Sequence, residues 1–375
     1  MKYLIICNGY PKKNESNIYI FVHRQALALK EAGNTVAVLD IDLRSIRWKR
    51  RFGFFRENYD GIDVYRFSFP FVTVIFKDLY SKLNKRIGVY CAKRIFHDYG
   101  KMDIVCPHFA MGAGEAAIAI KKKYCIPVVL TEHSSRILSS DDVVLNRYKY
   151  VYDSADATIT VGQALSNKLK KHGINNTVIP NVIDTEIFKP YHIKSKKNKI
   201  FLSVGSLQQR KRFDLFIRAF SKVQTLMPNS EAIIIGSGDL KKELKSLALE
   251  LNVRHLKFIN SVTNDKMPKY YSMADCFVLP SDFETFGMVY AEAIACGTPA
   301  VGTANGGAQE IITLENGIII PKNDPDSLAN AMMHIIDNTY DKNELHQYIE
   351  QNFGVQHFLN EYNIICKRIL SKYDR

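Results

Sequence analysis

The chain has 375 residues, of which 46% are hydrophobic and 24% are charged. This length exceeds what one hydrophobic core usually serves, so it predicts two domains, and the composition argues against a disordered chain. The seven cysteines are scattered without a CxxC pair, which argues against a disulfide framework or a zinc site and predicts reduced thiols in the cytosol.

The first half of the chain alternates short apolar runs with longer amphipathic ones. YLIIC (3–7) predicts a buried first strand, because the run is too short for a signal peptide or a membrane span. A helix is predicted over 21–33, ending at Gly33. Further strands are predicted at 35–40, 62–67, 103–109, 126–133, 157–161 and 176–180. Apolar strands with helices between them indicate a parallel sheet covered on both faces.

Nearly all of the net charge of +13 lies in the first half, where residues 1–183 hold 28 Lys and Arg against 16 Asp and Glu. Six of these basic residues lie in RSIRWKRRFGFFR (44–56), interleaved with aromatic rings, and KDLYSKLNKR (77–86) adds more. Aromatic and cationic side chains together suit an anionic membrane surface, while a solvated basic face without a partner is an equal alternative. No nucleic-acid motif accompanies the charge, so nucleic acid is not the expected partner.

The pattern restarts after a polar stretch at 184–198. Strands are predicted at 199–205, 231–236, 255–259, 275–280 and 298–303, and an amphipathic helix at 355–370. We therefore expect two Rossmann-like domains, 1–183 and 199–352, joined by a linker at 184–198 and followed by a C-terminal helix at 353–375. A ligand would bind at the carboxyl ends of the strands, in the cleft between the domains.

One carboxylate stands alone in the second half: Glu292 is the only charged residue from Phe286 to Gln309. The predicted helix around it begins at Thr285 or Gly287, and its free backbone N–H groups and dipole favour an anion. Glu292 lies on an apolar face of this helix, where an unpaired carboxylate would be costly. Either it accepts hydrogen bonds from a polar ligand such as a ribose, or it reaches solvent or pairs with a lysine.

The stretch FETFGMVYAEAIACGTPAVG (283–302) resembles the signature of family 4 of the retaining glycosyltransferases, also described as glycosyl transferases group 1, which have the GT-B fold. The signature has two glutamates with seven residues between them, here Glu284 and Glu292. The resemblance implies that Glu284 contacts the sugar of the nucleotide sugar and that Glu292 contacts the ribose. It also implies that the backbone of Phe286, Gly287 and Met288 cradles the diphosphate.

A second stretch, VGSLQQRKRFDLFIRAF (204–220), resembles the family's V-G-R-L-x-x-x-K-G-x-D. Lys211 stands where the family has its diphosphate-binding lysine, and fixed cations would stabilise a departing nucleotide diphosphate. The family's arginine is Ser206 here, and the glycine after the lysine is Arg212. Arg210 is therefore a candidate for supplying the missing guanidinium.

Further positions follow from the resemblance. GSGDL (236–240) matches the family's glycine loop near the nucleotide base, which assigns Gly236 to that site. In the first loop, 8–19, only Gly9 remains of the family's glycine pair. His108 and His133 each follow a predicted strand, and the family often places a histidine near the reacting carbon. Each could instead be a hydrogen-bonded structural histidine.

No metal site is expected. DID (40–42) resembles the D-x-D with which the other large glycosyltransferase fold holds manganese, but at the end of a strand such residues commonly make a loop or polar contact. Basic side chains and the helix dipole would replace the cation.

The resemblance thus implies a cytoplasmic, metal-independent retaining glycosyltransferase without a cofactor, in which His108, Glu284 and Lys211 carry the chemistry. Its co-substrate would be a UDP-sugar, or failing that a GDP-sugar. Its acceptor would be a saccharide or a lipid-linked saccharide of a surface polysaccharide pathway, at the inner face of the membrane. The alternatives are a non-catalytic nucleotide-sugar-binding protein and a two-domain NAD-dependent dehydrogenase, although the first loop lacks the G-x-G-x-x-G of a dehydrogenase.

Overall fold

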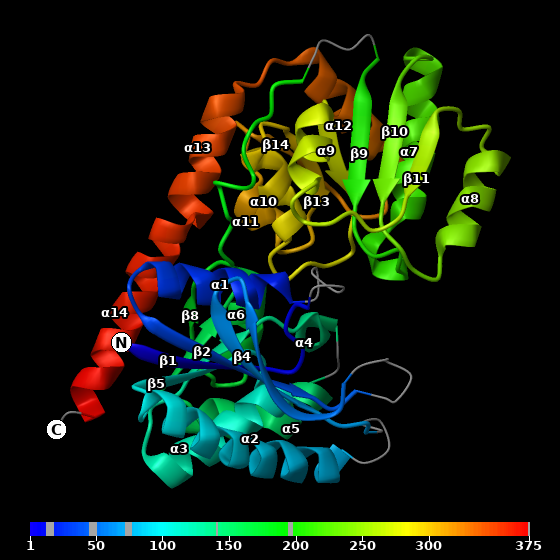
Figure 1. Cartoon of the computed structure of the whole chain (residues 1–375). Helices are drawn as coiled ribbons and strands as arrows, with labels where there is room; N and C mark the ends of the chain where they lie inside the picture. The colour runs from blue at the N-terminus through cyan, green and yellow to red at the C-terminus, as the bar shows by residue number, and fades with distance from the viewer. Residues whose placement is uncertain (13–18, 45–50, 72–76, 140–141, 194–197, 374–375) are drawn as a thin grey trace. The chain divides into compact units, whose positions relative to one another are not determined.

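The computed structural model describes residues 1–12, 19–44, 51–71, 77–139, 142–193 and 198–373. The chain divides into two compact units, Met1–Val182 with Phe358–Arg375, and Ile183–His357. Each unit is a mainly parallel sheet with helices packed against it (Figure 1). The predicted fold class, an α/β protein of two Rossmann-like units, is confirmed.

The sheet of the first unit has the strand order β3-β4-β2-β1-β5. Isolated bridges from Val105 to Val128 and from His108 to Thr131 place a second sheet, β6-β7-β8, beside β5. The order reverses between β1 and β5, and the loops after these two strands carry Gly9 and His108. The strands are β1 (Lys2–Cys7), β2 (Thr35–Asp42), β3 (Gly53–Tyr59), β4 (Ile62–Ser68), β5 (Ile104–Pro107), β6 (Val129–Glu132), β7 (Ala157–Thr160) and β8 (Thr177–Val178).

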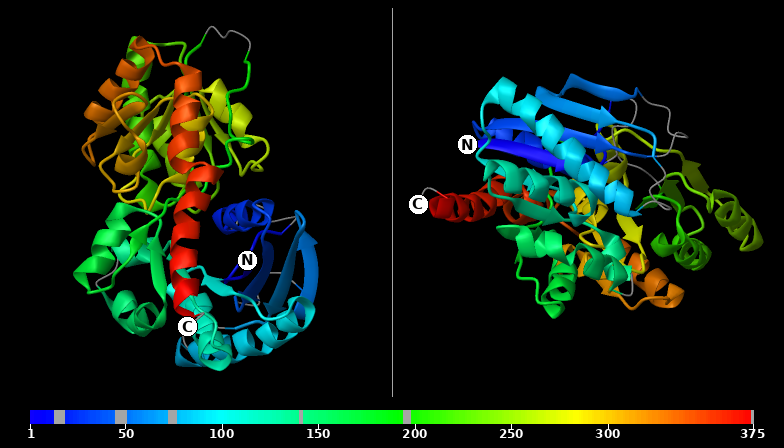
Figure 2. Two further views of the ribbon diagram at one scale, coloured as in Figure 1. Left: turned by 90° about the vertical axis from the view of Figure 1, so that its left-hand side faces the viewer. Right: turned by 90° about the horizontal axis from the view of Figure 1, so that it is seen from below.

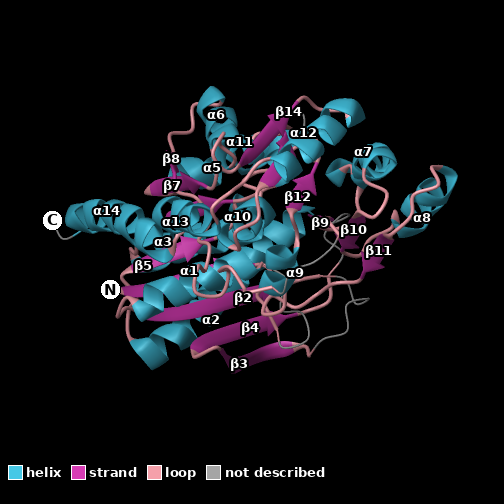
Figure 3. Ribbon diagram, turned by 90° about the horizontal axis from the view of Figure 1, so that it is seen from above, coloured by secondary structure: helices cyan, strands magenta, loops and turns pink. Residues whose placement is uncertain are grey.

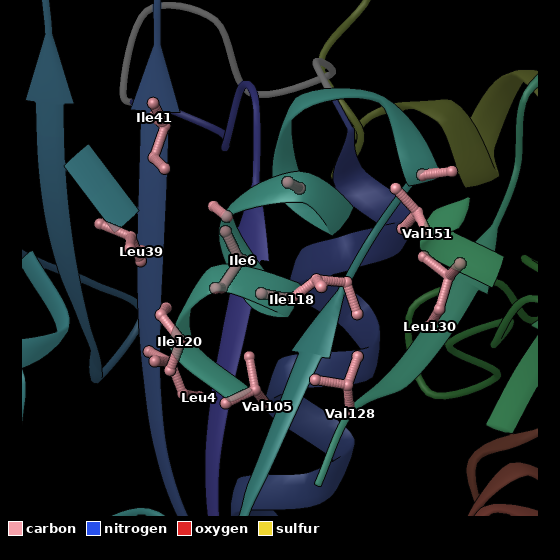
Figure 4. Close-up of a cluster of buried hydrophobic side chains, with 14 of the residues drawn as sticks. Leu4, Ile6, Leu39, Ile41, Val105, Ile118, Ile120, Val128, Leu130 and Val151 are labelled. Atoms are coloured by element: carbon pink, nitrogen blue, oxygen red, sulfur yellow. The ribbon is translucent and has the colours of Figure 1, made fainter. Parts of the chain in front are cut away.

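Helices pack against the sheets of the first unit and form a hydrophobic core with them. Side chains of β1, β2, β5 and β6 meet those of the covering helices, and Figure 4 shows Ile6, Ile118 and Leu130 among them. The helices are α1 (Ile20–Glu31), α2 (Lys77–Tyr99), α3 (Glu115–Tyr124), α4 (Ser135–Ser139), α5 (Val143–Ser154) and α6 (Gln163–Lys171), and an irregular turn over Ala110–Gly114 precedes α3.

Among the described strands of this sheet β3 alone is antiparallel, and it was not predicted from the sequence. It pairs with β4 through a two-residue turn at Asp60 and Gly61, which both have positive φ, 48° and 75°. The basic aromatic stretch 44–56 thus enters a strand at its end, while residues 45–50, with Trp48, lie outside the described residues.

The sheet of the second unit is parallel throughout, with the order β11-β10-β9-β12-β13-β14. This order reverses between β9 and β12, which is the switch point where doubly wound sheets bind ligands. β14 was not predicted. The strands are β9 (Ile200–Val204), β10 (Glu231–Ile235), β11 (Leu256–Ile259), β12 (Cys276–Leu279), β13 (Ala300–Thr303) and β14 (Gly317–Ile320).

Two groups of helices pack against this sheet, seen with the strands in Figure 3. In one group, α7 (Phe213–Leu226) contacts α8 (Lys241–Glu250) and α12 (Pro325–Asp337). In the other, α10 (Met288–Ala295) contacts α9 (Met267–Met273), α11 (Ala308–Ile311) and α13 (Lys342–Phe353). A short 3-10 helix, Gln209–Lys211, precedes α7.

The last helix, α14 (Val355–Tyr373), belongs to the first unit from Phe358 onward, and it is drawn in red in Figure 2. The ring of Tyr362 lies 6.2 Å from that of Tyr3 on β1, and the Tyr373 hydroxyl donates to Asp156. None of the described helices has the length and apolarity needed to cross a bilayer.

Candidate active site

The loops after β9 and β12 bring two cations onto one carboxylate. The Lys211 ammonium lies 2.5 Å from the Glu284 carboxylate, and Arg210 Nη1 lies 3.4 Å from the same oxygen. Arg210 also donates to the carbonyl of Phe283, and its guanidinium lies 5.7 Å from the centre of that residue's ring. Three residues that the sequence placed in one site are therefore in contact at the switch point of the sheet.

Backbone contacts with a third loop hold Glu284 in place. Its N–H donates to the carbonyl of Asn305, and its carbonyl accepts from the N–H of Gly307. A Cβ atom at Gly307 would lie 2.5 Å from the carbonyl oxygen of Phe286, so only glycine allows the loops after β12 and β13 to approach this closely. The backbone of Glu284 is therefore held between the loops after β12 and β13.

Burial and neighbouring charges shift the pKa values of Glu284 and Lys211. Burial opposes ionisation of Glu284, but the charges of Lys211 and Arg210 outweigh it and hold the pKa of the carboxyl below its usual value. Burial also lowers the pKa of Lys211, and the carboxylate only partly offsets this effect. The cluster is thus a buried ion pair whose two members depend on each other.

The helix that follows Glu284 begins where the sequence predicted. Gly287 is the N-cap residue of α10 with φ 89°, a conformation that favours glycine, and Met288 is the first helical residue. No side chain caps this N-terminus, and its first turn contains no acidic residue. Phe286 is buried against Phe353. The amino end of α10 therefore has the backbone polarity that favours an anion.

Glu292 is 7% exposed, and the Tyr271 hydroxyl on α9 donates to its Oε2 at 2.9 Å. The sequence carries no local signal for this partner, because Tyr271 is 21 residues away and no spacing rule links the two helices. The Tyr271 ring is fully buried against Phe188 and Phe277, so the hydroxyl has a fixed position. The Glu292 carboxylate is therefore oriented by the protein.

The remaining residues of the second unit assigned by resemblance lie in neighbouring loops. Ser206 is exposed in the loop after β9. Gly236 follows β10, and a Cβ atom there would lie 1.8 Å from the carbonyl oxygen of Gly205. The glycine loop after β10 thus packs directly on the loop that leads to Lys211.

In the first unit, a buried ion pair holds the first loop. The Gly9 N–H donates to Asp40 at 2.8 Å, and Asp40 pairs with Arg66, which also donates to the carbonyls of Tyr10 and Pro11. Asp42 pairs with Arg44 and Lys12. The two aspartates of DID therefore make loop and ion-pair contacts, and the Gly9 N–H is used within the protein. Residues 13–18 of this loop lie outside the described residues.

His108 and His133 are in contact in the first unit. His108 Nδ1 lies 2.8 Å from His133 Nε2, and the rings are stacked with centroids 5.1 Å apart. Burial lowers the pKa of His108 to about 3, and burial together with the neighbouring His108 holds the pKa of His133 well below its ordinary value. Both rings are therefore neutral near pH 7, so one nitrogen of the pair donates and the other accepts.

Glu132, which the sequence reading did not single out, connects the two histidine loops. Its buried carboxylate accepts from the N–H groups of Ala110, His133 and Ser134 and from the Tyr152 hydroxyl. Burial raises the pKa of Glu132 against the effect of these four hydrogen bonds. The segments that follow His108 and His133 are therefore anchored on one side chain.

Within the described ranges, no group of three or more His, Cys, Asp or Glu side chains is placed to hold a metal ion. In the second unit Lys211 and Arg210 contact Glu284, while Glu292 lies on the following helix with Tyr271 as a partner. In the first unit the two candidate histidines form a pair.

Comparison with known proteins identifies the family of the chain. Residues 20–187 match the family model described as Glycosyltransferase Family 4, and residues 184–353 match Glycosyl transferases group 1. Uncharacterized glycosyltransferase MJ1607 of Methanocaldococcus jannaschii is 30% identical over 88% of this chain and 87% of its own length. The chain therefore belongs to the family 4 glycosyltransferases.

Two further proteins are similar to this chain. A GDP-mannose-dependent monoacylated alpha-(1-6)-phosphatidylinositol monomannoside mannosyltransferase of Corynebacterium glutamicum is 31% identical over 35% of this chain and 36% of its own. The structure of HepE of Anabaena in complex with UDP and glucose superposes with a TM-score of 0.72 at 18% identity, covering 100% of this chain and 99% of the other. At that identity the structural likeness concerns the fold, which is GT-B.

Proposed function

We propose that this glycosyltransferase is a retaining, metal-independent enzyme that moves a sugar from a nucleotide diphosphate sugar to a saccharide or lipid-linked saccharide in surface glycan synthesis. The observation that carries the proposal is the contact of Lys211 and Arg210 with Glu284 at the switch point of the second sheet. Two fixed cations beside a carboxylate provide what a departing diphosphate and a sugar hydroxyl need.

Each part of the sugar donor has a partner in this proposal. The diphosphate contacts Lys211, Arg210 and the amino end of α10, and the transferred sugar donates hydroxyls to Glu284. The ribose donates to Glu292, whose carboxylate is already oriented by Tyr271. These contacts use protein charge and backbone polarity in the role that a metal ion has elsewhere.

UDP is the favoured nucleotide, because the similar HepE structure contains UDP and glucose. A GDP-sugar is the second candidate, because the similar mannosyltransferase of Corynebacterium glutamicum is named as GDP-mannose-dependent.

The acceptor is proposed to bind through the first unit, where His108 and His133 follow β5 and β6. A neutral imidazole of this pair can accept a hydrogen bond from an acceptor hydroxyl without a charge of its own. No carboxylate is assigned as a covalent nucleophile. The acceptor hydroxyl therefore attacks the anomeric carbon on the same face from which the diphosphate leaves. The leaving phosphate oxygen takes up the proton of that hydroxyl.

A membrane-bound acceptor is supported by one face of α2. Its exposed residues at positions 79, 82, 86, 90 and 93 recur at helical spacing and comprise Leu79, Lys82, Arg86, Tyr90 and Lys93. Cations with exposed apolar side chains on one helix face suit the surface of an anionic bilayer on which the enzyme would bind peripherally.

The test is release of nucleotide diphosphate from UDP- and GDP-sugars, measured with a panel of saccharide and lipid-linked acceptors and with EDTA present. Acceptor-dependent release that survives EDTA, with the anomeric configuration of the sugar retained in the product, supports the proposal. Binding of a nucleotide sugar without any release would instead support the non-catalytic binding protein.

A further inference from the structure

Arg212 stands where the family has glycine, and the backbone at this position explains the family's choice. Its φ and ψ are 51° and 43°, the left-handed conformation that glycine adopts at little cost and other residues adopt with strain. The residue here is nevertheless arginine, the amino acid with the largest cationic side chain. Strain of this kind persists only where the surrounding structure compensates for it.

The compensation is a set of polar contacts made by one guanidinium. Arg212 Nε and Nη2 donate to the two carboxylate oxygens of Asp214, each at 3.1 Å. Its Nη1 donates to Asp282 at 3.2 Å and also to the Asn323 side chain. The rigid fork of a guanidinium can bind all three partners at once, which a lysine cannot do.

These partners lie on three segments that follow the strands β9, β12 and β14 of the sheet. Asp214 lies in the first turn of α7, on the same segment as Arg212, whereas Asp282 lies in the loop after β12 and Asn323 in the loop after β14. The Asp282 N–H in addition donates to the Arg210 carbonyl at 2.8 Å, so backbone and side chain join the same two loops. Glu284 follows Asp282 by two residues, and Arg210 and Lys211 directly precede Arg212.

We infer that Arg212 is a positioning residue that fixes the loop of Glu284 against the loop of Arg210 and Lys211, and so sets the geometry in which the nucleotide diphosphate sugar binds. The inference rests on the proposed function for its ligand, but the contacts that carry it are independent of that ligand. Arg212 itself does not touch the donor in this account. Where a glycine would make no side-chain contact, Arg212 connects its own loop to the loops of Asp282 and Asn323.

The test compares Arg212→Gly, Arg212→Lys and a matched control, Arg218→Ala, which removes an exposed arginine from α7. Arg212→Gly is informative because glycine relieves the backbone strain while the side-chain contacts are lost, so the fold should be retained and Tm should change by only a few degrees. Hydrogen exchange of the amides from Asp282 to Gly287 is measured first, without any nucleotide. We expect faster exchange in Arg212→Gly, intermediate exchange in Arg212→Lys and no change in Arg218→Ala.

The second readout is the affinity for the nucleotide diphosphate that binds the wild-type protein, together with the KM for the corresponding sugar donor. In Arg212→Gly we expect the dissociation constant of the nucleotide and the KM of the sugar donor each to rise about fivefold, as for the loss of partly exposed ion pairs. The KM of the acceptor should not change. Adding Asp282→Ala to Arg212→Gly should then have little further effect, since the shared contact is already absent.

The outcomes separate the two claims. If the wild-type protein binds no nucleotide, the proposed function fails, whereas the exchange measurement still tests the connection between the loops. If the wild-type protein binds a nucleotide and Arg212→Gly has the same affinity, KM and loop exchange, then Arg212 is not a positioning residue. A loss of Tm with unchanged exchange in the Glu284 loop would make its role general stability and would also overturn the inference.

Discussion

The Lys211 ammonium and the Glu284 carboxylate form a buried ion pair at 2.5 Å, on loops that leave neighbouring strands of the second sheet. Arg210 reaches the same carboxylate from the side of Phe283. In the proposed reaction the two cations bind phosphate and the carboxylate binds a sugar hydroxyl. The ion pair therefore combines phosphate binding and sugar binding, and each of its two residues can be tested separately.

Replacing Glu284 by glutamine should separate transfer from nucleotide binding. The loss of a charged partner for the sugar should lower the transfer rate about 100-fold. UDP or GDP should bind at least as tightly as before, because Lys211 and Arg210 no longer pair with a carboxylate. Initial rates and calorimetric titration measure the two effects, with Glu243→Gln, an exposed glutamate on α8, as control. Transfer at the wild-type rate in Glu284→Gln would exclude the assigned role.

Replacing Lys211 by methionine should reduce stability, because the Glu284 carboxylate would be left buried without its main partner. Breaking a buried ion pair on one side costs about 3 kcal/mol of unfolding free energy. The double variant Lys211→Met with Glu284→Gln should recover most of this loss, since no unpaired charge remains. Urea unfolding of the four proteins measures the coupling. Purely additive effects would show that the pair does not matter for stability.

Glu292 should make the protein discriminate between ribose and its deoxy analogue. Wild-type protein should prefer UDP to 2′,3′-dideoxy-UDP, and Glu292→Gln should bind UDP about tenfold more weakly while losing this preference. Tyr271→Phe should show a smaller loss of the same kind, because the carboxylate keeps its charge but loses the hydroxyl that orients it. An equal loss for both nucleotides in Glu292→Gln would point to a structural role instead.

Stability should fall on acidification partly because His108 is buried and neutral. An ordinary histidine takes up a proton near pH 6.5, whereas burial lowers the pKa of His108 to about 3. Between these values the unfolded chain binds more protons, so the free energy of unfolding decreases as the pH falls, by at most about 1.4 kcal/mol per pH unit for this histidine. His108→Asn should show a shallower dependence from pH 6.5 downward.

The control for this prediction is His97→Asn, because the His97 side chain is 89% exposed. Its unfolding free energy should follow the wild-type dependence on pH. A wild-type slope in His108→Asn as well would mean that His108 titrates in the folded protein much as it does in the unfolded chain.

Charge reversal on α2 should weaken binding to anionic vesicles. The variant Lys82→Glu, Arg86→Glu, Lys93→Glu should sediment less with phosphatidylglycerol vesicles at low salt than the wild type does. The control reverses three exposed lysines of the second unit, Lys242, Lys266 and Lys269, with the same change in net charge. If neither variant differs from the wild type, or the wild type does not bind at all, the membrane proposal is wrong.

Much of the fold could be predicted from the sequence, because apolar strands bounded by glycines and helices repeat at regular intervals. β3 was missed since its charged and aromatic residues obscure the alternation, although Asp60-Gly61 is a strong hairpin signal. β14 was not predicted because its four residues, GIII, are too few for their hydrophobic periodicity to distinguish a strand from a helix.

The candidate site could be predicted only where its residues lie in one short motif. Glu284, Glu292 and Lys211 stand in such motifs, whereas Tyr271 comes to Glu292 from another helix. The positive φ of Arg212 and its reach to Asn323, 111 residues away, depend on how the sheet orders its strands. Contacts of this kind follow from tertiary structure and have no local signal.

The most direct test of the account is a thermal-shift panel of UDP, GDP, ADP, CMP and their common sugars, with NAD as a control, on the wild type and Glu292→Gln. The account predicts that one nucleotide diphosphate, UDP or else GDP, raises Tm in the wild type and that the shift is much smaller in the variant. No response to any nucleotide, or a response to NAD alone, would contradict a nucleotide-sugar site built from Lys211, Glu284 and Glu292.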